Sequence, residues 1–231
     1  MKRLTLSFFA LAGLLFSACN STAPEEAIET REAEEVAAPA EEESAATYTV
    51  SLDGDEINWE GYETFSGDNH YGTIQVSEGK FMTENGQLVG GSFVIDMGSI
   101  HSQDLAEDPG SYKKLVGHLK SPDFFAVDSF PTASFNITKV EAAPESDTTG
   151  ATHWVSGNLE MRGLTNNITI PAMVSMENGL IEFSTPEFVI DRSKWNVRFR
   201  SYSFKEFANV AKDKAIDNNI KLKVNLSASK A

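Results

Sequence analysis

The residues best suited to binding a charged group lie in the 15 positions from Asp191 to Lys205. This stretch interleaves five basic residues with four aromatic ones. Arginine can hold a phosphate through two parallel hydrogen bonds, and the amphipathic ring of tryptophan suits the wet mouth of an apolar site. For Arg198 and Arg200 we favour a simpler interpretation, in which both lie on the solvated face of a strand. Arg192 and Trp195 are therefore the candidates for contact with a ligand head group at the mouth of a site, and a purely structural role is equally open for them.

The four histidines add little chemistry. They stand at positions 70, 101, 118 and 153, without the spacing of a metal site. His118 falls on a predicted helix beside Leu119, which favours a position at a groove, and His70 is the other candidate for the mouth. The chain carries no Gly-x-Ser-x-Gly, P-loop, Gly-x-Gly-x-x-Gly or His-Glu-x-x-His motif. We therefore expect no catalytic residue, no metal and no cofactor.

The apolar side chains carry more information than the polar ones. The chain has 15 phenylalanines, and only three of them lie in its first 18 residues. Such side chains fill the core of any β-rich domain, but their number also suits an internal tunnel. Composition leaves both possibilities open. The candidates for a tunnel lining are Phe93, Ile95, Phe124, Phe125, Phe135, Ile137, Ile170, Val174 and Phe183.

These side chains must be positioned by β-strands, because alternation of apolar and polar residues dominates the sequence from residue 48 onward. It is clearest over residues 168–176 and 220–226. Asn-Gly pairs at 85–86 and 178–179 predict hairpin turns, and Gly90-Gly91 is a further punctuation point. Antiparallel strands with one apolar face each must close or stack, which predicts an all-β fold.

One helix interrupts the strands, and we expect it over residues 109–120. Asp108 can cap it, and Pro109 fits its first position. Tyr112, Leu115, Val116 and Leu119 would then share one face.

The first 47 residues are different in kind. Residues 1–18 have the basic start, apolar centre and small terminal residues of a signal peptide. The only cysteine, Cys19, follows directly, as in a bacterial lipoprotein, where it would be lipidated. Cleavage without lipidation is the alternative. Residues 20–47 contain nine Glu and one Arg, so we predict that 19–47 is a lipidated Cys followed by a disordered acidic linker, with one domain over 48–231.

Several motifs in register resemble the YceI-like family. They include the run Lys113–Val140, the stretch Arg162-Gly163-Leu164-Thr165, and Asp191-Arg192-Ser193-Lys194-Trp195. The resemblance spans about residues 48–226. It implies an extended, lipocalin-like antiparallel β-barrel of about eight strands, and secreted or envelope proteins that associate with long isoprenoid lipids. The segment from Ser66 to His70 departs from the family's usual Thr-Gly-x-His pattern.

We therefore expect a protein of the bacterial cell envelope that is lipid-anchored at the outer membrane and holds a polyisoprenoid or similar long-chain amphiphile in its barrel. The alternative is a structural or interaction module with a solid barrel core. The formal charge of −15 disfavours nucleic acid as a partner. A homodimer is the default oligomer.

Overall fold

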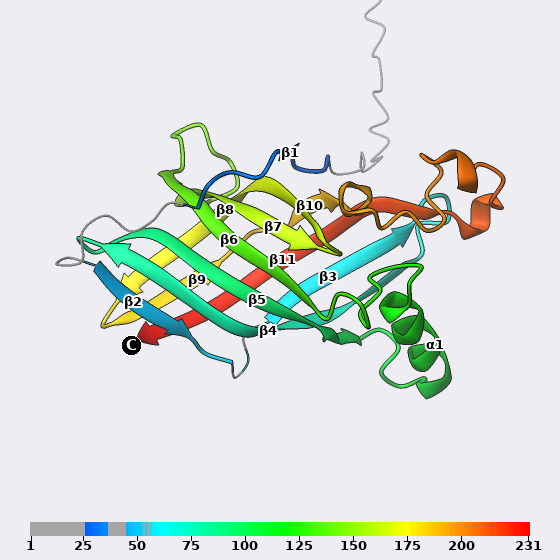
Figure 1. The fold of residues 1–231 in the computed structure, drawn as a ribbon, viewed down its shortest axis with the longest axis horizontal. Coiled ribbons are helices and arrows are strands. Elements are labelled where there is room, and N and C mark those ends of the chain that lie inside the picture. The colour runs from blue at the N-terminus through cyan, green and yellow to red at the C-terminus, as the bar shows by residue number, and fades with distance from the viewer. Residues whose placement is uncertain (1–25, 37–44, 53, 55) are drawn as a thin grey trace, which may run out of the picture.

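The computed structural model describes residues 26–36, 45–52, 54 and 56–231, in which antiparallel strands surround an elongated interior (Figure 1). The strands are β1 (Thr30–Arg31), β2 (Ala45–Val50), β3 (Glu56–Glu63), β4 (Asn69–Glu84), β5 (Gln87–Ser102), β6 (Thr132–Ala142), β7 (His153–Met161), β8 (Leu164–Glu177), β9 (Leu180–Ser184), β10 (Phe188–Asp191) and β11 (Ile216–Lys230). The helices are α1 (Pro109–Lys120) and the single-turn 3-10 helices η1 (Arg192–Trp195), η2 (Lys205–Phe207) and η3 (Lys212–Lys214).

Eight strands close into a ring. Its order is β3, β4, β5, β6, β7, β8, β9, β11 and back to β3, with antiparallel pairing at every step. β2 and β3 pair with successive parts of β11 on one side, and β9 and β10 do so on the other. Closure encloses the inward side chains and pairs the strand edges. The predicted lipocalin-like barrel of about eight strands is confirmed.

Local signals in the sequence account for the turns and the helix. Asn85-Gly86 and Asn178-Gly179 have positive φ at both residues and join β4 to β5 and β8 to β9. The Asp108 carboxylate accepts hydrogen bonds from the amides of Gly110 and Ser111, both at 3.1 Å, at the start of α1. These predictions are confirmed. The Gly90-Gly91 pair, in contrast, lies inside β5, where a side chain at Gly91 would meet the Lys80 carbonyl of β4.

The end of the barrel away from α1 is filled by large side chains. The Phe81 ring lies 5.0 Å from Phe93 and 5.4 Å from Phe183, and Phe81 has no exposed surface. Ile137, Val155 and Ile181 are also buried, each at most 1% exposed. This half of the barrel is a packed core, because residues from facing strands meet across the interior.

Residues 26–36, which we call the strap, run along the outside of the barrel between β8 and β10. Thr30 and Arg31 pair with Ile168 and Asn167 of β8, and the Ile28 amide donates to the Val189 carbonyl of β10 at 2.8 Å. The prediction of a disordered linker is therefore wrong for these residues, and β2 also begins at Ala45 rather than Tyr48.

The physical reason is that β8 and β10 do not pair with each other, so main-chain groups of both strands are left for an extended segment to pair. The amide side chain of Asn158 donates to the Glu34 carbonyl at 2.6 Å and accepts from the Glu34 amide at 3.0 Å. Arg31 donates to Asn167 and Thr169, at 3.2 and 2.6 Å. An acidic segment that would be disordered alone is ordered by partners more than 100 residues away in the sequence.

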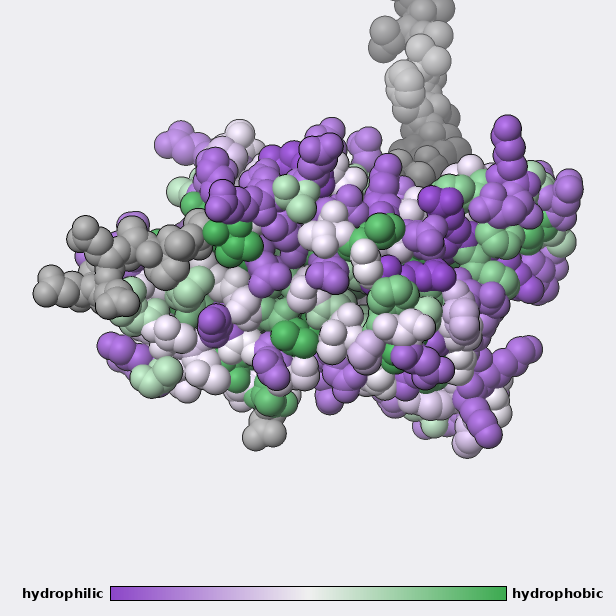
Figure 2. Space-filling model, in the orientation of Figure 1, coloured by the Kyte–Doolittle hydropathy of each residue, from purple (hydrophilic) through white to green (hydrophobic). Residues whose placement is uncertain are grey.

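Hydrophilic residues cover most of the face of the molecule that Figure 2 presents, and hydrophobic ones are scattered over it, some of them at its right-hand end. Within the described residues, no helix has both the length and the apolar character needed to cross a bilayer.

Deletion of residues 26–36 is expected to lower the free energy of unfolding by about 2–3 kcal/mol, because several main-chain and amide hydrogen bonds are lost at about 1 kcal/mol each. Denaturant unfolding measures the loss, and hydrogen exchange should be faster in β8 and β10. The matched variant Glu32→Ala, which removes an exposed carboxylate of the strap, should leave both unchanged. Unaltered stability of the deletion variant would contradict the assignment of the strap as part of the fold.

Candidate ligand-binding site

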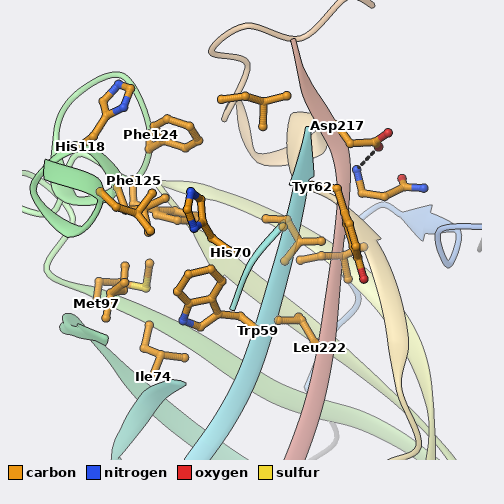
Figure 3. Close-up of a pocket in the computed structure, with 18 of the residues that line it drawn as sticks. Trp59, Tyr62, His70, Ile74, Met97, His118, Phe124, Phe125, Asp217 and Leu222 are labelled. Carbon is orange, nitrogen blue, oxygen red and sulfur yellow. Dashed lines mark hydrogen bonds between the residues drawn. The ribbon is translucent and has the colours of Figure 1, made fainter. Parts of the chain in front are cut away.

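A cavity of about 720 Å³ occupies the barrel end next to α1 (Figure 3). Its walls come from β3, β4, β5, β6, β7, β10 and β11, and one face of α1 closes part of it. The volume lies within the range of sites that hold small organic ligands. The interior therefore has two parts, a packed half and a hollow half.

The deep walls of the cavity are apolar. They are formed by Ile57, Trp59, Ile74, Ile95, Met97, Ala133, Leu159 and Leu222. Most of these are buried or half-buried. The inward face of β3 contributes Ile57, Trp59 and Gly61, which alternate along the strand. A side chain added at Gly61 would meet no atom within 4 Å, so the space beside this residue is open. Such walls can hold a hydrocarbon chain but offer it little polar contact.

The mouth is formed by exposed residues from three parts of the chain. They are Asp68 and His70 around the start of β4, Ser111 and Lys114 of α1, and Lys214 of η3. Charges of both signs are therefore present, and Arg200 and Asp217 also contribute to the lining.

His70 is the polar group that its neighbours orient most firmly. Its Nδ1 lies 2.7 Å from Oδ2 of Asp104, and the other oxygen of Asp104 accepts from the Ser102 hydroxyl at 2.7 Å and the Tyr71 amide at 3.2 Å. Burial raises the pKa of Asp104, but the hydrogen bonds from His70, Ser102 and Tyr71 outweigh it and hold the pKa below its usual range. An ionised Asp104 accepts the proton on Nδ1 and leaves Nε2 of His70 for a ligand. In Figure 3 the His70 ring lies beside Phe125 and Trp59.

His118 also lines the cavity, as expected, but its ring is held by aromatic packing. It lies edge-on to Phe124 at 4.9 Å and to Phe199 at 4.8 Å, and its Nε2 is 3.2 Å from Oδ2 of Asp123. The predicted positions of His70 and His118 agree with the lining of the cavity.

Three of the nine predicted tunnel residues line this cavity, namely Ile95, Phe124 and Phe125. The other six, Phe93, Phe135, Ile137, Ile170, Val174 and Phe183, do not. Most of them belong to the packed half of the barrel or lie against it. The Phe135 ring covers Gly157 of β7, where an added Cβ would lie 2.4 Å from its Cζ atom. The inward direction was predicted for these residues from alternation, but which half of the barrel is filled depends on the side chains that face them.

The prediction of Arg192 as a head-group contact is wrong. Its guanidinium is 1 % exposed and donates to the carbonyls of Val197, Phe199, Ile216 and Asp217 at 2.7–3.1 Å. Burial lowers the pKa of Arg192 to about 10, against the opposing charges of Asp191 and Asp217, so the group stays protonated at neutral pH. Its role is to fix the loop after η1 to the start of β11.

Trp195 is also structural rather than a mouth residue. Its side chain has no exposed surface, and Nε1 donates to the Leu159 carbonyl at 2.9 Å. A tryptophan whose single donor is satisfied inside the protein has no group left for a ligand.

Several lining residues were missed from the sequence. Trp59 and Tyr62 of β3 lie at the cavity, and burial is the main reason that the pKa of Tyr62 is raised to about 12. The alternation of Ile57, Trp59 and Gly61 was a signal for this wall. Leu115 and Leu119 line it from the apolar face that was predicted for α1. No pattern in the sequence pointed to Asp104.

Two further predictions concern the signal peptide and the lipidated cysteine. Residues 1–18 and Cys19 are outside the described residues. Among the residues that are described, no group of three or more His, Cys, Asp or Glu side chains could hold a metal ion.

Comparison with known proteins agrees with this architecture. Among solved structures, BcnA of Burkholderia cenocepacia aligns with a TM-score of 0.54 at 18% identity, over 78% of this chain and 99% of that one. A polyisoprenoid binding domain from Saccharophagus degradans, implicated in plant cell wall breakdown, aligns with a TM-score of 0.55 at 11% identity, over 80% of this chain and 99% of that one. At these identities the likeness is one of fold. A search of curated protein sequences finds no match.

A family model for the YceI-like domain matches residues 48–228, which include the whole ring of strands and the cavity. The chain therefore belongs to the YceI-like family.

Proposed function

We propose that this protein binds one long-chain amphiphile, a polyisoprenoid or a similar lipid, in the cavity of its barrel. The observation that carries the proposal is an apolar cavity of about 720 Å³ with a polar, exposed mouth. A chain lies against Trp59, Ile74 and Leu222, and the head group stays at the mouth. The polyisoprenoid binding of the Saccharophagus degradans domain supports this choice of ligand class.

The chemistry of the site favours binding over catalysis. At about 0.8 kcal/mol for each buried CH₂ group, a hydrocarbon chain supplies enough free energy for a carrier without polar contacts. His70 then selects among head groups. The family and the fold are those of binding proteins.

We further propose that the mature protein is held at the bacterial outer membrane by lipid on Cys19. The basic, apolar and small-residue segments that precede this only cysteine support the proposal. Two or more acyl chains suffice for stable membrane residence. Homodimerisation stays a prediction.

The alternative function is an interaction module of the envelope with a solid barrel. The packed half of the barrel, around Phe81, favours it. The cavity at the other end argues against it, because a module that needs only its outer surface has no use for an apolar space open to solvent.

Gly61→Phe is the variant that tests the cavity. The new ring would enter open space and should reduce the lipid recovered by organic extraction and native mass spectrometry severalfold, with little loss of stability in the delipidated protein. The control is Gly117→Phe on the exposed side of α1, where there is also open space but no cavity. Equal lipid content in the parent and the Gly61→Phe protein would overturn cavity binding.

His70→Phe tests the head-group contact. The affinity for a C20 isoprenoid alcohol should fall about two- to tenfold, the value of one hydrogen bond, whereas the affinity for a C20 isoprenoid hydrocarbon should be unchanged. Quenching of tryptophan fluorescence, with Trp59 in the wall, reports both affinities. A parallel loss for both probes would assign His70 to packing instead.

Cys19→Ala tests the anchor. The variant should move from the membrane pellet to the soluble envelope fraction with its unfolding free energy unchanged, because the described fold begins at residue 26. Fractionation followed by a salt wash measures the distribution. Retention in the washed pellet would show that the anchor is not lipid on this residue.

A further inference from the structure

The loop between η1 and β11 carries an unusual share of the chain's basic residues. Residues 196–215, which we call the mouth loop, contain five Lys or Arg and two Asp or Glu. α1 adds three Lys and no acidic residue. These two elements thus hold eight of the 19 basic residues but only two of the 34 acidic ones. The local excess of positive charge stands out in a protein whose net charge is −15.

The mouth loop and α1 lie side by side at the open end of the cavity. The Phe199 ring of the loop packs against His118 of α1 at 4.8 Å and against Phe124 at 5.5 Å. Lys114 of α1 and Lys214 of the loop both border the cavity. Figure 1 places both elements at the same end of the barrel. Basic residues of both elements therefore lie at the entrance, where Glu63, Asp68 and Asp217 also line the cavity.

Exposed aromatic rings are interleaved with these cations. Phe65, in the turn between β3 and β4, is 51% exposed and packs against Tyr202, which is 36% exposed, at 5.2 Å. Lys212 lies 5.4 Å from the Phe65 ring, and Arg198 lies 4.5 Å from the Phe204 ring. Figure 2 shows hydrophobic and hydrophilic residues interspersed at this end of the molecule. Large apolar groups exposed beside Lys and Arg are typical of surfaces that meet the membrane interface.

We propose that this end of the barrel, formed by the mouth loop, α1 and Phe65, docks on an anionic phospholipid surface. The basic side chains contact the lipid head groups, and Phe65 and Tyr202 enter the interface. The cavity entrance then faces the bilayer, so an apolar ligand can pass between bilayer and barrel with little exposure to water. The docking itself does not depend on the identity of the cavity's ligand.

Acidic groups at the same end of the barrel limit the contact with the lipid surface to the mouth loop, α1 and Phe65. Glu63 and Asp68 flank the turn that carries Phe65. Three acidic residues, Asp104, Glu107 and Asp108, precede α1, and Asp217 lies at the start of β11. Of the acids in the mouth loop, Asp213 lies 3.8 Å from Lys214. Lys205 and Lys212 are exposed, and each is followed in the sequence by an exposed acidic residue, Glu206 and Asp213.

The course of the strap agrees with this orientation. The Ile28 amide donates a hydrogen bond to a carbonyl of β10, and β10 leads directly through η1 into the mouth loop. Seven residue steps separate Cys19 from Glu26, and even fully extended they reach no more than about 25 Å. If Cys19 is lipidated as proposed above, the end of the strap is held close to the bilayer.

The test uses the chain carrying Cys19→Ser, recovered from the soluble envelope fraction, so that an anchor contributes no binding. Cosedimentation is measured with vesicles of phosphatidylcholine alone and of phosphatidylcholine with phosphatidylglycerol. We expect binding to the anionic vesicles only, weakened by salt. The triple variant Lys205→Gln, Lys212→Gln, Lys214→Gln should bind at least tenfold more weakly, since each basic residue near an anionic surface contributes about 1 kcal/mol, or about fivefold.

The matched control is Lys80→Gln, Lys139→Gln, Lys230→Gln, which makes the same change in net charge at the packed half of the barrel and should bind like the parent. Phe65→Ser with Tyr202→Ser should also weaken binding. Equal loss in the control, no loss in the mouth-loop variant, or equal, salt-insensitive binding to both vesicles would overturn the proposal. Native mass spectrometry of the same proteins distinguishes a failure of docking from a failure of cavity binding. If only cavity binding fails, the parent protein carries no lipid but still binds the anionic vesicles.

Discussion

Closure of the strand ring is the constraint on which the other features depend. Once β11 pairs with both β3 and β9, the circumference is fixed, and each inward position has a limited volume to fill. Three phenylalanine rings, those of Phe81, Phe93 and Phe183, meet in one half of the barrel and help to fill it. On the side of α1 the inward positions include Gly61 and Ala133, and the same circumference is left partly empty. One architecture thus supplies both a rigid core and a cavity.

The second constraint is the buried charge of Arg192. A guanidinium removed from water must have its donors satisfied, and here four main-chain carbonyls do so. Those carbonyls belong to the mouth loop and to β11, so the charge fixes the loop that borders the cavity. Arg162 strengthens the same region by donating to the carbonyls of Asn196 and Pro122, at 2.8 and 2.7 Å. Arg192, whose residue type suggests a contact with phosphate, instead holds in place the loop at the cavity entrance.

Much of the fold could be predicted from the sequence because its signals are local. Alternation gave the inward faces of the strands, the Asn-Gly pairs gave two hairpins, and Asp108 with Pro109 gave the start of α1. The filled half of the barrel could not be located, because Phe135 meets Gly157 only after two strands have paired in register. The Asp104–His70 pair spans 34 residues and has no periodic signal. The strap has the composition of a disordered segment, and its order comes from the edges of β8 and β10.

The strap, the cavity and the mouth loop are connected through β10. This strand is bonded to Ile28 on one side and continues into η1, where Arg192 and Trp195 begin the support of the entrance. A lipid anchor on Cys19, as proposed, would therefore act on the barrel beside the mouth rather than at the packed half. The strap has five Glu and one Arg, a net charge of −4, whereas the mouth loop has five basic and two acidic residues, a net charge of +3. In the proposed docking, an anionic lipid surface would therefore attract the entrance and repel the strap.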